Sequence, residues 1–224
     1  MQSLLLPALI LTLIGVLSTP LQAAETDWAL KKDDDGITIY TRSVEGSRYK
    51  AVRAEMLVDG TVTALTALVL DSERCAEWAA HCKSSTVLKT LSDTHFIHYT
   101  LNDLPWPVAD REGITDVRWA QDAADGTVTM TATLLSGDDV PPETPSARGA
   151  VRLTTGTTSW AFTPAEAGKV RVVSEAHIDP EGATPAWLTN RLLVGAPFET
   201  MVAMRTLLGS GRYNDARVPW IAEP

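Results

Sequence analysis

Apolar and polar residues alternate over most of this chain, and the alternation predicts a series of β-strands. It is clear over residues 47–58, where Val52, Ala54, Met56 and Val58 fall on one face. Further strands are predicted at residues 36–42, 84–91, 94–102, 113–122, 125–135, 150–156, 157–164 and 169–179. The pattern therefore indicates a sheet of many short strands.

Three stretches follow a helical period instead. Residues 26–36 predict a short amphipathic helix that stops at Gly36. Residues 61–81 predict one or two helices, with Asp59 and Thr61 as candidate caps. Residues 185–208 predict a long amphipathic helix with a kink near Pro197. Strands, a helical insert, more strands and a last long helix indicate an α+β domain, an antiparallel sheet closed by a helix.

The first residues differ from the rest. Residues 1–23 carry no charged side chain and end in small residues, which predicts a signal peptide cleaved near Ala23 or Ala24. One domain over residues 24–224 and a periplasmic or secreted location follow from it. An uncleaved membrane anchor is the alternative.

The net charge of −9 argues against nucleic acid or an anionic membrane surface as the main partner. Cys75 and Cys82 are the two cysteines, and an oxidising compartment permits a disulfide between them. On one continuous helix their Cα atoms would lie about 10 Å apart, so a disulfide requires a break between them. His81 beside Cys82 is too little for a zinc site, and we expect no metal.

Trp106 stands between two prolines in the stretch LPWPVADRE, which holds it on a stiff, non-helical segment. Arg111 follows with Asp110 and Glu112 on either side. A buried Arg needs a partner, so either Asp110 pairs with it or a ligand does.

An ordered set of segments resembles the START family, the steroidogenic-regulator-related lipid-transfer domains, in their bacterial form. The segments are EWAAHCKSSTVL, LPWPVADRE, VPPETPSARGAVRL, SWAFTP and HIDPEGATPAWLTNRLLVGAPFETM. The resemblance implies a helix-grip fold, in which a curved antiparallel sheet wraps around the C-terminal helix and encloses a hydrophobic tunnel. It also implies a non-catalytic lipid carrier that needs no cofactor.

The resemblance places the ligand inside the tunnel and a lid over it. Our candidate ligand-binding residues are Tyr99, Trp106, Arg111, Trp119, Met130, Leu188, Leu192, Phe198 and Met201. The C-terminal helix and the loop of residues 136–149 are expected to form the lid. Val140, Pro141 and Pro142 of that loop are expected to touch a membrane briefly, and a lipid or sterol-like molecule is the expected partner of a monomeric protein.

Two other functions stay open. The wider superfamily of this fold includes aromatases and cyclases, so an enzyme acting on a polyketide or another apolar substrate is one alternative. Glu175, His177 and Asp179 share a strand face and are the one candidate acid-base cluster, although we expect this face to be exposed and the face of Val172, Ser174, Ala176 and Ile178 to be buried. An interaction module whose own side chains fill the tunnel is the other alternative.

Overall fold

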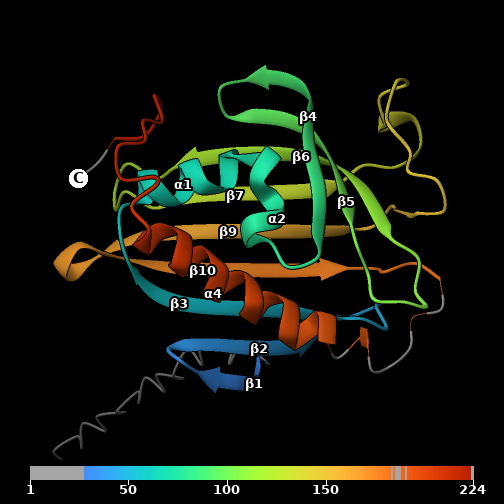
Figure 1. Cartoon of the computed structure of the whole chain (residues 1–224), viewed down its shortest axis with the longest axis horizontal. Helices are drawn as coiled ribbons and strands as arrows, with labels where there is room; N and C mark the ends of the chain where they lie inside the picture. Colours follow the sequence, from blue (N-terminus) through green and yellow to red (C-terminus); the bar gives the residue numbers. More distant parts are fainter. Residues whose placement is uncertain (1–27, 183, 185–187, 190, 223–224) are drawn as a thin grey trace, which may run out of the picture.

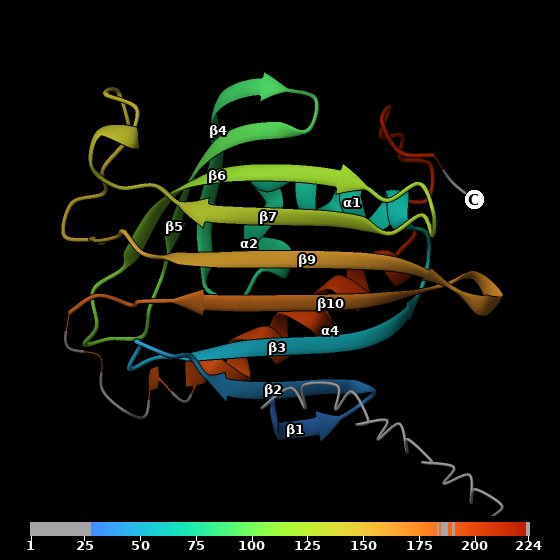
Figure 2. The same cartoon turned by 180° about the vertical axis from the view of Figure 1, so that it is seen from behind.

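A curved antiparallel sheet carries the α-helices of the described residues on one face (Figures 1 and 2). The computed structural model describes residues 28–182, 184, 188–189 and 191–222. Within these residues, ten strands form the sheet: β1 (Ala29–Asp34), β2 (Ile37–Ser43), β3 (Lys50–Asp59), β4 (Cys82–Ser92), β5 (His95–Asn102), β6 (Arg111–Gln121), β7 (Val128–Leu134), β8 (Val151–Leu153), β9 (Gly156–Ala165) and β10 (Lys169–Ile178). The spatial order is β1-β2-β3-β10-β9-β7-β6-β5-β4, and short β8 pairs with β6 in parallel.

The helices lie along the concave face (Figure 1). They are α1 (Val62–Leu70), α2 (Cys75–Trp78), the π-helical turn η4 (Arg191–Gly195) and α4 (Ala196–Gly209). Three short 3-10 turns, η1 (Ser72–Arg74), η2 (Gly137–Asp139) and η3 (Glu166–Gly168), complete the described elements. The expected antiparallel sheet with a C-terminal helix is confirmed.

The first described element corrects the sequence analysis, because residues 29–34 form strand β1 and not a helix. β1 pairs antiparallel with β2. The turn between them holds Asp35 at φ 51° and Gly36 at φ 71°. Two successive left-handed residues of the Asp-Gly type are the preferred connection of a tight β-hairpin, and the separation of Trp28 and Leu30 by two residues fits a strand and not a helix.

The helical insert is confirmed as two helices. The Thr61 hydroxyl caps α1 by accepting a hydrogen bond from the amide of Ala64 at 3.1 Å. The chain breaks after Leu70 and resumes as the short α2, with Trp78 at its end. Asp59 does not cap; it accepts a hydrogen bond from Lys169 at 2.7 Å.

The main core lies between the sheet and the helices. Val52, Ala54, Met56 and Val58 of β3 all point into it, as their alternation predicts. Phe162 of β9 is fully buried beside them. Aromatic side chains stack through this core, with the ring centroids of Trp160 and Phe162 6.1 Å apart.

The C-terminal helix is irregular where a kink is predicted. A π-helical turn precedes α4, and Pro197 lies in the first turn of α4. A proline there loses no hydrogen bond within α4, because the first amides of a helix have no intrahelical acceptor. Pro185, the predicted start of the helix, lies outside the described residues.

The stretch Leu192–Gly209 is, within the described part of the chain, the one helix long and apolar enough to cross a membrane by length and composition alone. Core helices pass the same test. Here α4 lies along the sheet, and Met201, Met204 and Leu208 are buried against it.

A second, smaller core lies on the opposite face of β5 and β6. It is formed by Ile97, Tyr99 and Ile114, and Val140 and Leu135 cover it from the segment that follows β7. Side chains alternate along a strand, so these residues point away from the main core, while Phe96 points into it. Both faces of the sheet are therefore covered at this edge.

Glu112 fastens the loop of residues 136–149 over this second core. Its buried carboxylate accepts hydrogen bonds from the Tyr99 hydroxyl at 2.7 Å, the Ala147 amide at 2.7 Å and the Ser146 hydroxyl at 3.1 Å. Arg152 adds an ion pair at 2.8 Å. Burial alone would raise the pKa of Glu112, but these hydrogen bonds outweigh it, and the pKa lies below its ordinary value. The loop is thus held by a satisfied, charged anchor.

We predict that Glu112→Gln destabilises the protein by about 3 kcal/mol, because Arg152 loses its buried counterion. The lowered pKa means that this stabilisation is complete above the unfolded value near 4.5 and is lost as the pH falls through the folded value. Urea unfolding between pH 7 and pH 3 checks both points. The wild-type advantage should shrink in acid, and an equal gap at both pH values would contradict the assignment.

Candidate functional site

A cavity of about 320 Å³ lies between the sheet and the first half of α4. Strands β3, β9 and β10 form one wall, and η4 and α4 form the opposite one. Its lining is mostly apolar and includes Val52, Ala54, Trp160, Ser174, Ala176, Ile178, Leu192, Leu193, Ala196 and Met201. Such a volume lies at the lower end of the range for small-molecule sites.

Small side chains keep this space open. Ala54 and Ala176 face it from the sheet, and Ala80 and Ala196 face it from the helical side. Farther along α4, the larger Met204 and Leu208 pack directly into the core. One helix therefore closes a core with its second half and a cavity with its first half.

Polar side chains gather at the end of the cavity where β5 meets β6. His81, Asn102 and Arg111 all line it there. Cys82 pairs with Asn102 across β4 and β5, and Asn102 pairs with Arg111 across β5 and β6. Two strand spacings of about 4.8 Å thus separate the backbone of Arg111 from that of Cys82, the residue next to His81.

Arg111 is a buried cation, only 6% exposed. Its guanidinium donates to the carbonyl oxygens of Pro180 at 2.7 Å, Ala109 at 2.6 Å and Glu181 at 3.1 Å. No carboxylate of the described residues forms an ion pair with it. Burial lowers the pKa of Arg111, yet a guanidinium stays protonated at neutral pH.

This bonding corrects the predicted pair of Asp110 and Arg111. The Asp110 carboxylate instead accepts a hydrogen bond from Lys83 at 3.1 Å, and this contact holds its pKa below the ordinary value. Asp110 lies just before the first residue of β6, and its carboxylate is directed to Lys83 and not to Arg111.

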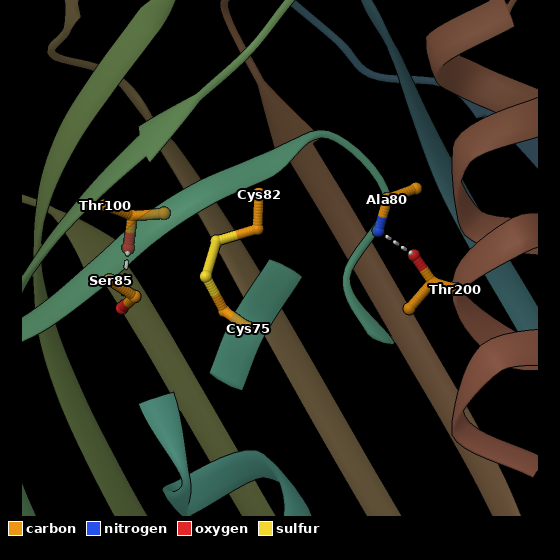
Figure 3. Close-up of a disulfide and its surroundings, with 6 residues drawn as sticks. All are labelled: Cys75, Ala80, Cys82, Ser85, Thr100 and Thr200. Carbon is orange, nitrogen blue, oxygen red and sulfur yellow. Dashed lines mark hydrogen bonds between the residues drawn. A yellow bond between two sulfur atoms is a disulfide. The ribbon is translucent and has the colours of Figure 1, made fainter. Parts of the chain in front are cut away.

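A disulfide between Cys75 and Cys82 fixes the turn that carries His81 (Figure 3). The predicted break is present, because α2 ends at Trp78 and β4 starts at Cys82, and the Cα atoms lie 5.8 Å apart. The turn is tied to α4 as well, since the Ala80 amide donates to the Thr200 hydroxyl at 3.0 Å.

His81 itself is held in an unusual state. Its backbone is left-handed, at φ 66°, a conformation that costs a non-glycine residue free energy. Its Nε2 atom is buried and has no hydrogen-bond partner among the described residues. Strain and an unsatisfied donor or acceptor occur together on the cavity wall.

Of the nine predicted ligand-binding residues, three line the cavity: Arg111, Leu192 and Met201. Trp119 and Met130 point to the same face of the sheet but lie in the filled core, where Trp220 covers Trp119 at a centroid distance of 6.1 Å. Leu188 is fully buried and does not line the cavity.

The other three do not reach the cavity either. Tyr99 faces the second core and donates to Glu112, so its predicted place in the tunnel is wrong. The Phe198 ring packs under the Lys32 ammonium at 3.4 Å. The Trp106 side chain is 90% exposed, although Leu104 in the same loop lines the cavity.

The loop of residues 136–149 also needs a correction. None of its residues lines the cavity, and Glu112 fastens it on the other face of the sheet, so it does not form the predicted lid. Val140 is turned into the second core, and of the three predicted membrane-contact residues only Pro142 is exposed.

The candidate acid-base cluster is absent from the cavity. Ser174, Ala176 and Ile178 line it, as predicted, so the alternate residues of β10 point outwards. Nε2 of His177 lies 3.0 Å from the Ser47 hydroxyl, and Glu175 lies 3.8 Å from Arg53. Within the described residues, no group of three or more His, Cys, Asp and Glu side chains could hold a metal ion.

Sequence analysis missed several cavity residues, above all His81 and Trp160. The alternation of β9 contained a usable signal for Trp160, because it shares a face with Phe162. Nothing in the sequence placed His81 there, since its position depends on the disulfide turn.

Comparisons with known proteins agree with this architecture. A crystal structure of a STAR-related lipid transfer protein from Xanthomonas axonopodis is 32% identical, with a TM-score of 0.72 over 82% of this chain and 99% of that one. Human STARD10 shares the fold, with a TM-score of 0.72 at 19% identity over 88% of this chain and 81% of that one. An uncharacterized protein, PA1579, of Pseudomonas aeruginosa is 32% identical over 82% of this chain and 88% of its own length.

The family model described as START domain matches residues 9–210, nearly the whole chain. The match starts inside the predicted signal peptide, whose cleavage stays a prediction. The predicted resemblance and the helix-grip fold are both confirmed: this chain belongs to the START domain family.

Proposed function

We propose that this protein is a non-catalytic carrier that binds a single lipid or other hydrophobic molecule in the cavity under α4. The observation that carries the proposal is an apolar cavity of about 320 Å³ in a START domain. A ligand that buries about 400 Å² of apolar surface there gains on the order of 10 kcal/mol before ordering costs. The name of the Xanthomonas relative, a lipid transfer protein, supports the same function.

Release of the ligand requires movement of the first half of α4 and of η4. These elements form one wall of the cavity, and the residues from 192 to 198 are only half-buried. Fewer buried contacts lower the free energy of local opening. The second half of α4 stays anchored by Met204 and Leu208.

Membrane contact runs through the loop of residues 103–110 and not through Val140, Pro141 and Pro142. Trp106 is the most exposed large apolar side chain of the described residues, and Leu104 beside it borders the cavity. Tryptophan favours the membrane interface, where its ring is half in the apolar layer. The net charge of −9 favours a neutral, zwitterionic surface.

The cavity assignment is tested by organic extraction and mass spectrometry of protein exported to a bacterial periplasm. Wild type should carry a co-purifying lipid, and Ala176→Trp should carry at most about a tenth as much, because the indole fills the cavity. Ser174→Phe serves as a second filling variant.

Arg171→Trp is the matched control, since Arg171 lies on the same strand and is exposed on the other face. Circular dichroism and the unfolding midpoint confirm folding of each variant. A folded Ala176→Trp protein that retains a full load of lipid would place the ligand elsewhere. An empty wild type without uptake would favour a filled interaction module.

Vesicle sedimentation tests the membrane contact. Trp106→Ala should bind phosphatidylcholine vesicles about tenfold more weakly, because a buried aromatic contributes more than about 1.4 kcal/mol. Trp106→Phe should restore part of the binding. Leu57→Ala, which removes another exposed apolar side chain, is the control and should have no effect. Equal binding by Trp106→Ala would show that another surface meets the membrane.

Export is tested by the intact mass of the protein recovered from a bacterial periplasm. Cleavage near Ala23 or Ala24 predicts a chain that begins at Ala24 or Glu25. A full-length, membrane-bound chain would support the uncleaved anchor instead. Size-exclusion chromatography with light scattering checks the expected monomer.

A further inference from the structure

The cavity wall has a charge of the opposite sign to the protein as a whole. The protein carries a net charge of −9. The described side chains that line the cavity nevertheless include Lys50 and Arg111 and no Asp or Glu. The polar end therefore has a positive potential inside a negative protein.

Among the described residues, Arg111 lacks a full set of partners. A guanidinium has five N–H donors, and three of its nitrogens each donate to one carbonyl. Two N–H groups remain, and carbonyl dipoles do not neutralise a buried charge as a carboxylate would. A buried cation without a counterion is unfavourable, so the site is completed when an anion enters.

His81 offers a second contact from the opposite side of the same end. Its Nε2 is buried and unpartnered among the described residues, and its strained backbone is held by the disulfide turn. Its carbonyl oxygen accepts a hydrogen bond from the Asp103 amide at 2.8 Å, which keeps the turn against the end of β5. Strain that persists next to an unsatisfied polar atom is typical of a binding site.

The size of the cavity restricts the apolar part of the ligand. A volume of about 320 Å³ suits a molecule with one acyl chain better than one with two. Away from the polar end, the cavity wall is formed by apolar side chains, such as Val52 and Leu193, and by side chains with hydroxyl groups, such as Ser174. This part of the wall would surround such a chain.

Resting on the proposed carrier function, we propose that the ligand is a single-chain lipid with a carboxylate head, a fatty acid, whose head lies between Arg111 and His81. Arg111 holds the carboxylate by charge-assisted hydrogen bonds, and His81 donates from Nε2. Lys50, which is exposed, attracts the acid to the entrance.

The test compares three probes that share one chain: laurate, lauryl alcohol and methyl laurate. Each is titrated into delipidated full-length protein by isothermal calorimetry, with the fluorescence of Trp160 and the other tryptophans as a second readout. Laurate should bind at least about tenfold more tightly than the alcohol or the ester, because only the carboxylate forms charge-assisted hydrogen bonds.

Variants assign the preference to residues. Arg111→Met should abolish the preference for laurate, and His81→Phe should weaken laurate binding about tenfold while leaving the alcohol unchanged. Lys83→Met is the matched control, since Lys83 is a cation outside the cavity wall. If Arg111→Met does not fold, His81→Phe still tests the carboxylate site, because it should weaken the binding of laurate and leave the binding of the alcohol unchanged.

The outcomes separate this inference from the carrier function. Equal or tighter binding of the alcohol or ester, lost in Ala176→Trp, overturns the carboxylate head and leaves the carrier standing. Binding of none of the three probes, together with an empty wild-type protein after extraction, overturns both. A laurate preference that survives in both His81→Phe and Arg111→Met overturns the assigned residues.

Discussion

The packing of α4 on the concave face of the sheet is the contact on which the rest of the molecule depends. An amphipathic helix must bury its apolar face, and the curved sheet offers a surface wider than one helix can fill. Where Met204 and Leu208 meet the sheet, the contact is a core. Where small residues meet, at Ala54, Ala176 and Ala196, the same contact leaves a cavity.

The second half of α4 therefore contributes to stability, and its first half forms the wall of the binding cavity. The second half of α4 packs into the main core between the sheet and the helices, and deforming it would cost close-packed contacts. The first half starts from a π-helical turn and is tied to the disulfide turn through Ala80 and Thr200. A ligand bound under this half supplies the apolar contacts that the side chains of the protein do not make there.

The two faces of β6 carry buried charges of opposite sign. On the outer face of β6, Glu112 is buried with a complete set of donors and fastens a long loop. On the inner face, the preceding residue, Arg111, is buried and forms no ion pair with a carboxylate of the described residues. Two adjacent ionisable residues therefore differ in role, one structural and one available to a ligand, because a strand turns them to opposite sides.

The sequence by itself determined the order of the elements, the inward face of β3 and β10, the capped helical insert and the need for a break between Cys75 and Cys82, because these depend on local period, caps and turns. Its ordered motifs also identified the family. Local pattern failed at residues 29–34, where a tight turn overrides helical spacing. Only the tertiary structure decided which of two covered faces holds the cavity, so Tyr99 and the loop of residues 136–149 were assigned to the wrong side. The place of His81 was decided in the same way, by a disulfide turn and a neighbouring strand, since contacts between residues far apart in sequence leave no trace in the periodicity of either segment.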